Sequence, residues 1–367
     1  MTETIVRTEF SAPTDIVAVT RAAGVAGAGG AGFPTYAKWK RVNEVNYLLM
    51  NHQESEPNYF IDKWLGQEHP AAFASLFKFL LDEFFEVVIV SAKRKDRDCL
   101  RVLERLTDGT VYSPDQLPLD PTEESGVVFA YTRNTYQFGM ENVLLNVVAE
   151  TVIDDSLPMD HGWLVQNTET LYNLSRALTE GVPVTRTYVH VGGNVPQHRF
   201  LDVPIGTSAE TLLQAAGLPR SRLEADSVLV TGGPGWCFPI DAAPEQFGVR
   251  KHTNCLMVLD RATVDEYTLG GDRIDVLEAG DWSEREYETE PSERISPDTV
   301  RIPLVTNPNM RVIESSDPTV AVGETVEVGD RVAAPSTTGV SIPQHASIDG
   351  RVTAVEETSI TIQAVQQ

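Results

Sequence analysis

Short apolar runs alternate with helical patterns through residues 12–180, and this alternation restricts the fold of that part more than any other feature. Apolar strands are predicted at residues 45–50, 87–91 and 126–132. Helices are predicted at 12–24, 70–84 and 96–106, where apolar residues recur at helical spacing. Helices that alternate with short strands are typical of an α/β fold.

The pattern changes after Gly181. Paired strands are predicted at 186–192 and 197–203, followed by a helix at 208–216 and a strand at 228–231. This order indicates a small β-grasp unit. From residue 299 to the end, short apolar runs are separated by glycines, which indicates an all-β module.

Between these two parts lies an acidic segment, residues 261–297, with 11 Asp or Glu against 4 Arg. Such a composition predicts a solvated linker. We therefore expect four parts: an α/β domain at 1–182, a β-grasp domain at 183–260, an acidic linker at 261–298 and an all-β module at 299–367.

The formal net charge is −24, and only 7 of the 29 basic residues are Lys. No basic stripe is present, which excludes a nucleic-acid-binding role. The acidity has two explanations: a surface for a partner, or adaptation to a high-salt cytoplasm, where screening to about 3 Å mutes repulsion between carboxylates. Because the acidic residues are spread along the whole chain, the second, halophilic explanation is favoured.

Apolar runs and metal-ligand patterns are both sparse. No window of about 20 apolar residues exists, and Met1–Phe10 lacks the features of a secretion signal, so a cytoplasmic protein without a membrane span is expected. Histidines show no metal spacing, and no metal site is expected. An iron–sulfur cluster needs about four thiolates, and this chain cannot build one from its three cysteines. These are Cys99, Cys237 and Cys255.

A glycine-rich loop spans residues 24–32, and its glycines formally match G-x-G-x-x-G. A Rossmann nucleotide site needs a strand before this motif and a helix after it, whereas here a helical pattern precedes it and Pro34 follows. We therefore expect an α/β domain that is not a standard Rossmann fold. The loop is either a flexible turn or a cradle in which backbone N–H groups meet a phosphate, with Lys38 adding a charge.

The longest motif resolves this choice. Residues 29–35, read with Lys38 and Trp39, resemble the G-G-A-G-F-P-T-x-x-K-[LW] signature of the flavin-binding subunit of respiratory complex I, and equally of the RnfC subunit of Rnf complexes and the PduS cobalamin reductase. The resemblance implies that the loop cradles the phosphate of FMN and that an aromatic residue lies beside NADH. The implied FMN residues are Gly29, Gly30, Gly32 and Lys38, and the implied NADH residue is Phe33.

Asn51–Pro57 follows the first predicted strand. Two glutamates in such a run belong either to a solvated loop or to a ligand site at the carboxyl edge of a sheet. The run resembles N-x-x-E-x-E-P of the same family, which implies that Asn51 and Glu54 face FMN and that Glu56 meets the nicotinamide nucleotide. Gln53 departs from the Asp of complex I subunits, which weakens the NADH assignment more than the FMN assignment.

Two later segments continue the resemblance. Residues 136–141 resemble Y-x-x-G-x-E, which implies that Tyr136 and Gly139 lie beside the flavin and Glu141 beside the nicotinamide. Without the family, Tyr136 is equally a core aromatic, and Met140 departs from the motif. Residues 165–171 resemble a segment whose Asn touches the flavin, which implies the same for Asn167.

The rest of the chain resembles further modules of RnfC and PduS. Residues 184–260 resemble a soluble-ligand-binding β-grasp (SLBB) domain, and 299–367 resemble a barrel-sandwich hybrid module. The two-cluster ferredoxin module that RnfC and PduS place between them is missing, so the chain is identified as a family variant without it.

The resemblance implies an FMN-dependent, NADH-oxidising electron-transfer subunit. The flavin supplies the chemistry, so no catalytic side chain is expected. Without an iron–sulfur cluster of its own, the chain would pass electrons to a partner subunit or carrier, such as an iron–sulfur protein, and meet a membrane only through a partner. Two alternatives remain: a redox-inactive paralogue that acts as a nucleotide-binding scaffold, and an unrelated nucleotide-dependent α/β enzyme.

Overall fold

A computed structural model describes residues 13–282 and 285–365, which divide into two units. The first, here called the α/β unit, comprises residues 13–25, 34–55 and 62–183. The second, here called the β-rich unit, comprises residues 26–33, 56–61 and the described residues from 184 onward. Residues 1–10, for which no secretion signal is predicted, lie outside the described part of the chain.

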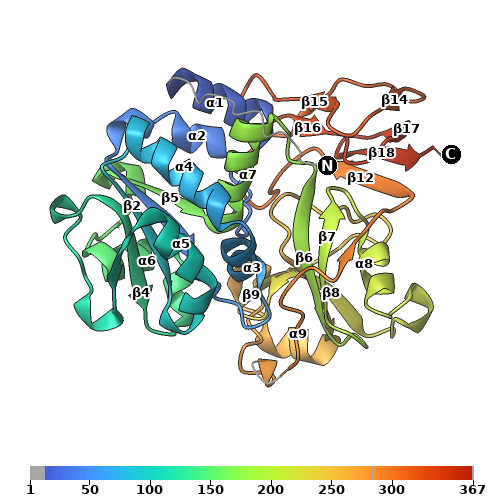
Figure 1. The fold of residues 1–367 in the computed structure, drawn as a ribbon. Coiled ribbons are helices and arrows are strands. Elements are labelled where there is room, and N and C mark those ends of the chain that lie inside the picture. Colours follow the sequence, from blue (N-terminus) through green and yellow to red (C-terminus); the bar gives the residue numbers. More distant parts are fainter. Residues whose placement is uncertain (1–12, 283–284, 366–367) are drawn as a thin grey trace, which may run out of the picture. The chain divides into compact units, whose positions relative to one another are not determined.

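The α/β unit is built on a five-stranded sheet with the order β3-β4-β2-β1-β5, in which all paired strands are parallel (Figure 1). The strands are β1 Tyr47–His52, β2 Val87–Lys93, β3 Thr110–Tyr112, β4 Gly126–Thr132 and β5 Trp163–Asn167. The helices are α1 Pro13–Ala22, α2 Thr35–Trp39, α3 Ile61–Glu68, α4 Pro70–Glu83, α5 Arg101–Thr107, α6 Glu141–Ala149 and α7 Thr168–Glu180. The predicted α/β fold is confirmed. The glycine loop lies between α1 and α2, so no strand leads into it, as the sequence predicts.

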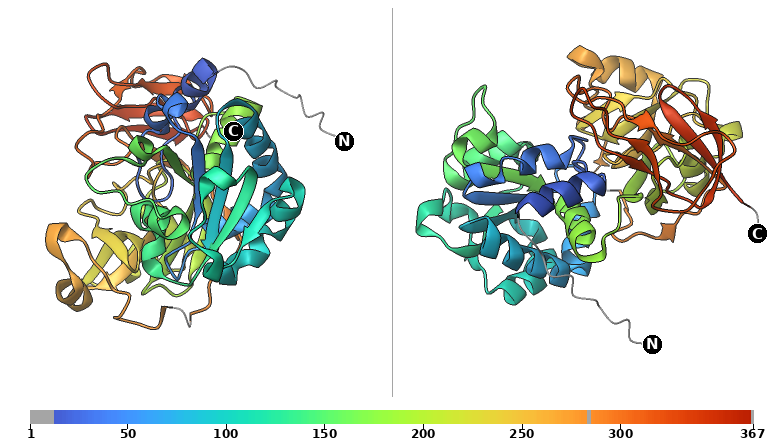
Figure 2. Two further views of the ribbon diagram at one scale, coloured as in Figure 1. Left: turned by 90° about the vertical axis from the view of Figure 1, so that its left-hand side faces the viewer. Right: turned by 90° about the horizontal axis from the view of Figure 1, so that it is seen from above.

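Both faces of this sheet are covered by helices. Leu49 and Ile89 pack against Leu144 and Val148 of α6 on one face. On the other face α4 contacts β2, and α7 contacts β1 and β5 (Figure 2). Every residue of β2 is buried, which explains why its sequence is a continuous apolar run instead of an alternating one.

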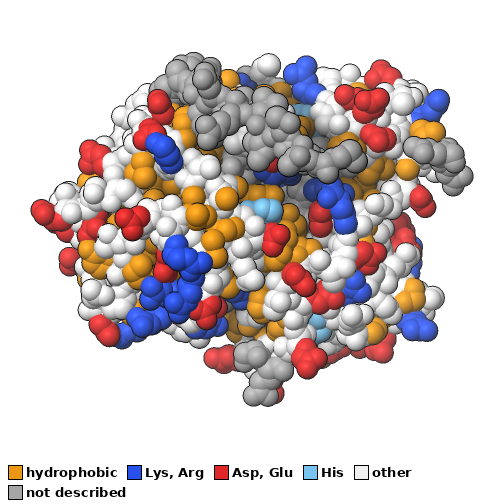
Figure 3. All heavy atoms as spheres, in the orientation of Figure 1, with side chains coloured by type: hydrophobic (Ala, Val, Ile, Leu, Met, Phe, Trp, Pro, Cys, Tyr) orange, Lys and Arg blue, Asp and Glu red, His pale blue; other side chains and the backbone are white. Residues whose placement is uncertain are grey.

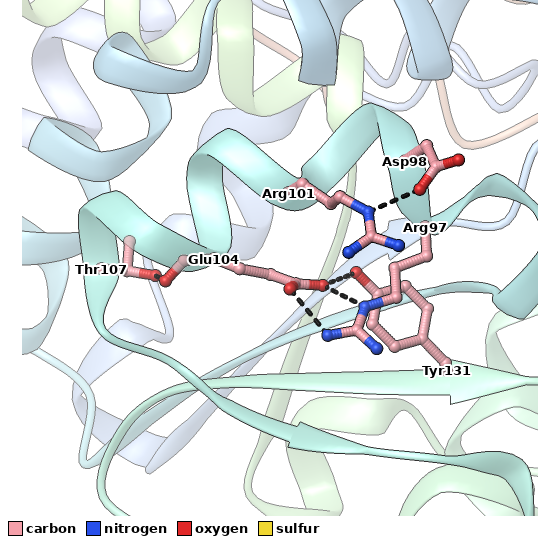
Figure 4. Close-up of polar contacts among 6 residues, drawn as sticks. All are labelled: Arg97, Asp98, Arg101, Glu104, Thr107 and Tyr131. Atoms are coloured by element: carbon pink, nitrogen blue, oxygen red, sulfur yellow. Dashed lines mark hydrogen bonds and ion pairs between the residues drawn. The ribbon is translucent and has the colours of Figure 1, made fainter.

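Helix α5 is shorter than predicted. The predicted helix at 96–106 begins as a 3-10 helix, Arg94–Leu100, and becomes an α-helix only at Arg101. Residues 94–98 are all charged, so they carry no apolar period that could distinguish the two helix types. Figure 4 shows how the segment is fastened: the guanidinium of Arg97 donates two hydrogen bonds of 2.9 Å to Glu104, which also accepts one from the Tyr131 hydroxyl of β4.

The β-rich unit contains a six-stranded sheet with the order β11-β7-β6-β10-β8-β9. Its elements are β6 Arg186–Gly193, β7 Arg199–Pro204, α8 Ala209–Ala215, β8 Ser227–Gly233, β9 Trp236–Pro239, β10 Cys255–Asp260, α9 Arg261–Tyr267 and β11 Glu293–Arg294. Strand β6 runs antiparallel to β7 and parallel to β10. The apolar side of α8 packs on this sheet through Leu212 and Leu213. The predicted strands and helix between residues 186 and 231 are confirmed.

The C-terminal strands form two further sheets, with the orders β12-β18-β17-β14 and β13-β15-β16. The strands are β12 Thr299–Pro303, β13 Asp317–Pro318, β14 Thr325–Val326, β15 Arg331–Ala334, β16 Gln344–His345, β17 Gly350–Val355 and β18 Ser359–Ala364. Residues 299–364 consist of strands and loops, drawn in orange to red in Figure 2, which confirms the all-β prediction. Their core includes Val300, Val332 and Ile360.

The acidic segment is not the solvated linker that its composition predicts. It opens with α9 and closes with β11, which pairs with β7. Ile274, Val276 and Trp282 belong to a buried core together with β8 and β10. The carboxylates of the segment can stay at the surface while these few apolar side chains pack into the core. A count of charged residues along the segment does not reveal so few apolar anchors.

Candidate functional site

The carboxyl ends of β1 and β5 bring two of the predicted site residues together. Asn51 and Asn167 are register partners on these neighbouring parallel strands. The Asn167 side chain caps α7 by accepting hydrogen bonds from the backbone N–H groups of Glu169 and Thr170, as helix N-caps commonly do. Its amide also donates to the carboxylate of Asp62 at 2.9 and 3.1 Å.

The predicted Tyr136–Gly139 turn lies against the loop that follows β1. The Asn51 amide donates to the Gly139 carbonyl at 2.8 Å, and the Ser55 hydroxyl donates to the Tyr136 carbonyl at 2.9 Å. A Cβ at position 139 would lie 2.2 Å from the Ser55 hydroxyl oxygen, so any larger residue there would displace the Ser55 side chain. The motifs at residues 51–57 and 136–141 thus meet at one edge of the sheet.

Lys38 reaches the same edge from α2. Its Nζ lies 3.3 Å from a carboxylate oxygen of Glu141 and donates to the Val165 carbonyl of β5 at 3.2 Å. Both side chains of this ion pair are partly exposed. Lys38 is predicted to bind a phosphate, and Glu141 is predicted to bind a nicotinamide nucleotide. In this structure the two side chains bind each other instead.

Two buried carboxyl groups, Glu54 and Asp62, lie beside these residues. Glu54 accepts hydrogen bonds from the backbone N–H groups of Asp62 at 2.8 Å and Lys63 at 3.2 Å. Burial raises the pKa of Glu54. Burial also raises the pKa of Asp62 well above its usual range, and the neighbouring Glu54 charge adds to the shift.

Two polar residues near Glu54 explain how its loop is held. The Gln53 side chain is buried and donates to the hydroxyls of Ser91 and Thr132, so the residue that departs from the family motif is part of the core of this unit. Lys93, which sequence reasoning missed, donates from Nζ to the Glu54 carbonyl at 2.8 Å, and burial lowers its pKa to about 8. The only sequence signal for Lys93 is its place at the end of a buried strand.

Residues 26–32 of the glycine loop belong to the β-rich unit. Its base is closed by hydrogen bonds from Gly27 N–H to the Phe33 carbonyl at 2.9 Å and from Gly32 N–H to the Gly27 carbonyl at 2.8 Å. Gly30 and Gly32 have positive φ angles of 91° and 64°, which disfavour residues with a Cβ. Residues 29–31 form an exposed tip, and a Cβ built on Gly30 would meet only one atom within 4 Å, at 3.9 Å.

Glu56 is buried in the same unit. Its carboxylate accepts a hydrogen bond of 2.9 Å from Gly235 N–H, in the turn between β8 and β9. A Cβ on Gly233 would lie 2.3 Å from the Glu56 side chain, so the turn closes tightly around it. The predicted site residues therefore fall into two sets. In the α/β unit they are Lys38, Asn51, Glu54, Tyr136, Gly139, Glu141 and Asn167, and in the β-rich unit they are Gly29, Gly30, Gly32, Phe33 and Glu56.

The described part of the chain contains neither a cluster of metal-ligating side chains nor a helix able to span a membrane. Residues 13–282 and 285–365 contain no group of three or more His, Cys, Asp or Glu side chains placed to hold a metal ion. Within the same residues, no helix combines the length and the apolar character that crossing a membrane requires.

The fold is shared with solved structures of NAD⁺-reducing [NiFe]-hydrogenase. A chain of the H₂-reduced state superposes with a TM-score of 0.54 at 19% identity, over 70% of this chain and 50% of that chain. A chain of the air-oxidized state gives a TM-score of 0.52 at 21% identity over the same shares. At these identities the similarity shows the fold alone.

Sequence comparison identifies the family. Residues 20–176 match the family model described as the Nuo51 FMN-binding domain. The cobalamin reductase PduS of Salmonella typhimurium is 30% identical over 58% of this chain and 43% of its own length. The ion-translocating oxidoreductase complex of Pseudomonas aeruginosa has a subunit that is 30% identical over 69% of this chain and 31% of its own length.

The chain spans less than half the length of these curated relatives. Residues 20–176 nevertheless carry the domain of complex I flavin subunits, and the chain belongs to the family that unites those subunits with RnfC and PduS.

Proposed function

We propose that this chain binds FMN, oxidises NADH through it and passes the electrons to a partner. The observation that carries the proposal is the convergence of four separate motifs at the carboxyl edge of the parallel sheet. Lys38 meets Glu141 there, and Asn51 meets both Gly139 and Asn167. Ligands of open α/β sheets bind at this edge.

The residues present fit such a flavin. FMN accepts hydride and releases one or two electrons, and this chemistry is its own. In the proposal, Gly29, Gly30, Gly32 and Lys38 hold the phosphate, because the loop tip is open and Lys38 supplies a cation. Amide and carboxylate groups suit the ring and the ribityl hydroxyls, since they offer several donors and acceptors. In the proposal, Asn51, Glu54 and Asn167 supply such groups, and Tyr136 and Gly139 lie beside the flavin.

NADH would be oriented by Phe33, Glu56 and Glu141. The carboxylates of Glu56 and Glu141 can each accept several hydrogen bonds from the ribose hydroxyls of the nucleotide. Lys38 would exchange Glu141 for the phosphate when FMN binds, which would release the Glu141 carboxylate for the nicotinamide nucleotide. NADH as the substrate also implies a cytoplasmic site of action.

We further propose the domain boundaries 1–182, 183–260 and 299–367 for a flavin domain, an SLBB-type β-grasp domain and a barrel-sandwich hybrid module. The strand order β7-β6-β10-β8 with α8 across the sheet supports the β-grasp assignment. Electrons would leave from the flavin to an iron–sulfur protein or another carrier, because three cysteines do not suffice for a cluster. The similarity to one component of an ion-translocating oxidoreductase complex supports the existence of a partner subunit.

The experiment is an absorption spectrum of the purified chain, reconstituted with FMN, before and after anaerobic NADH. We expect a yellow protein that NADH bleaches, that reduces an artificial acceptor such as ferricyanide, and that contains no iron or acid-labile sulfide. A protein that takes up FMN but is not bleached by NADH would contradict the NADH assignment alone. Stoichiometric iron and sulfide in the isolated chain would contradict the need for a partner cluster.

A redox-inactive scaffold is the second candidate. One observation favours it: the Glu56 carboxylate is buried and already bonded to Gly235, so it is not presented to a nucleotide in this structure. A colourless protein that takes up no FMN in a titration followed by flavin fluorescence would support this candidate over the flavoenzyme.

A further inference from the structure

Three side chains from late in the sequence bond to three carbonyl groups of the glycine loop. The Asn254 amide donates to the Ala28 carbonyl at 2.9 Å. The Thr306 hydroxyl donates to the Gly32 carbonyl at 2.6 Å, and the Asn307 amide donates to the Ala31 carbonyl at 2.8 Å. The donors are separated from their acceptors by 226 to 276 positions in the chain, and all of them lie in the β-rich unit.

The loop is also confined sterically at its second end. A Cβ at Gly32 would lie 2.8 Å from the Asn307 Cβ and 3.0 Å from His252 Nδ1. Ala28 and Gly32 are buried, whereas the tip between them is exposed. The two ends of the tip are therefore held, and the tip itself is open to a ligand.

This arrangement has a chemical consequence. An unbonded carbonyl oxygen repels a phosphate, whereas an N–H group attracts it. Engaging these three oxygens removes three acceptors that would repel an anion. The N–H groups of Gly30 and Gly32 themselves donate to the Ala28 and Gly27 carbonyls at 2.7 and 2.8 Å, so the same contacts fix the shape of the tip. Glycine-rich segments also lose the most conformational entropy on ordering, so a loop that is already held needs less ordering when a ligand binds.

We propose that Asn254, Thr306 and Asn307 are positioning residues for the flavin-binding loop. The affinity for the FMN phosphate then depends on hydroxyl and amide groups of the β-rich unit that themselves make no contact with the flavin. This inference rests on the proposed function, because it takes the glycine loop to be the phosphate cradle.

The test compares two isosteric substitutions in the full chain. Thr306→Val removes the hydroxyl that holds Gly32. Thr207→Val removes an equally buried hydroxyl of the same unit, which donates to the Pro204 carbonyl at 2.7 Å and does not contact the loop. We expect Thr306→Val to raise the FMN dissociation constant about tenfold, the scale of one hydrogen bond. Thr207→Val should change it less than about twofold at a similar loss of melting temperature, and Thr306→Ser should restore tight binding.

An equal FMN dissociation constant in the two valine variants would overturn the proposal. Amide hydrogen exchange of residues 27–33 in the flavin-free protein gives a second readout, which we expect to be faster in Thr306→Val than in Thr207→Val. Absence of FMN binding in the wild-type chain would refute the proposed function, and the exchange rates would then decide whether Thr306 holds the loop. If Thr306→Val does not fold, Asn254→Ala serves in the same comparison.

Discussion

At the scale of single residues, the buried carboxyl groups Glu54 and Asp62 are the most unusual feature of the α/β unit. Few buried acids are tolerated unless they are hydrogen-bonded, and these two accept bonds from backbone N–H groups and from the Asn167 amide. Their raised pKa values mean that the folded chain retains protons that the unfolded chain releases. This difference makes the stability depend on pH.

The first prediction concerns this dependence. An acid whose folded pKa lies above its unfolded value, about 4, makes the free energy of unfolding fall as pH rises from that value toward the folded pKa. We expect the wild-type chain to lose stability in this window and Asp62→Asn to flatten the decline, as measured by urea unfolding at several pH values. The exposed Glu123→Gln serves as the control and should leave the slope unchanged. An identical slope in Asp62→Asn would show that Asp62 does not retain a proton.

The second prediction concerns Lys38. Lys38→Ala should weaken FMN binding by about 1–3 kcal/mol, the scale of a hydrogen bond to a charged group. Lys40→Ala is the control. Lys40 is exposed and lies two residues further along the chain, so this variant loses the same charge but keeps Lys38 at the sheet edge. Titration of both variants with FMN, followed by fluorescence, checks the assignment. Unchanged affinity in Lys38→Ala would remove Lys38 from the phosphate site.

At the scale of elements, strand pairing sets boundaries that periodicity misses. The first strand is predicted at 45–50 but pairs from Tyr47 to His52, because its two neighbours, β2 and β5, determine which residues join the sheet. The extension places Asn51 inside the strand, next to Asn167. The acidic segment shows the same effect on a larger scale, since its contacts with β8 and β10 order residues that composition assigns to solvent.

The third prediction tests that segment. Trp282 is 5% exposed and donates from its indole N–H to the Val276 carbonyl at 2.7 Å. Trp282→Ala should lower the free energy of unfolding by about 3–5 kcal/mol, as expected for a buried aromatic. Leu269→Ala, in the same segment but 49% exposed, should change it by about 0.5 kcal/mol or less. Similar small effects in chemical denaturation of both variants would restore the linker interpretation.

At the scale of the whole molecule, the most prominent property is the net charge of −24. On the face drawn in Figure 3, the acidic side chains are dispersed, and a group of Lys and Arg gathers over the α/β unit. On this face, the dispersed acidic side chains do not mark a single partner surface. Their dispersal agrees with the halophilic hypothesis, in which dissolved salt screens repulsion that would otherwise oppose compaction.

The fourth prediction follows from this charge. The melting temperature should rise between dilute buffer and molar KCl, because the Debye length falls from about 10 Å at 0.1 M to about 3 Å at 1 M. Sucrose at equal osmolarity is the control, since it carries no charge and does not screen. A melting temperature that is flat or falls with KCl would refute the halophilic hypothesis.

Local sequence patterns were sufficient to predict several helices, strands and motifs of this protein. Helical and strand periodicity located α4, β2, β4 and the β6–β7 pair, because apolar spacing along a chain reflects which side of an element is buried. Matched residues also predicted that the glycine loop and the Asn51–Pro57 segment take part in binding flavin and nucleotide. These features depend on residues close together in sequence, so they can be recognised without the fold.

Only the tertiary structure decided the rest. The ion pair of Lys38 with Glu141 joins residues 103 positions apart, and the bonds that hold the glycine loop span more than twice that distance. Neither Thr306 nor Asn307 belongs to any local motif. Their contacts arise because folding brings these side chains to backbone carbonyl groups of a loop that is distant in sequence. No property of the neighbouring sequence records that meeting.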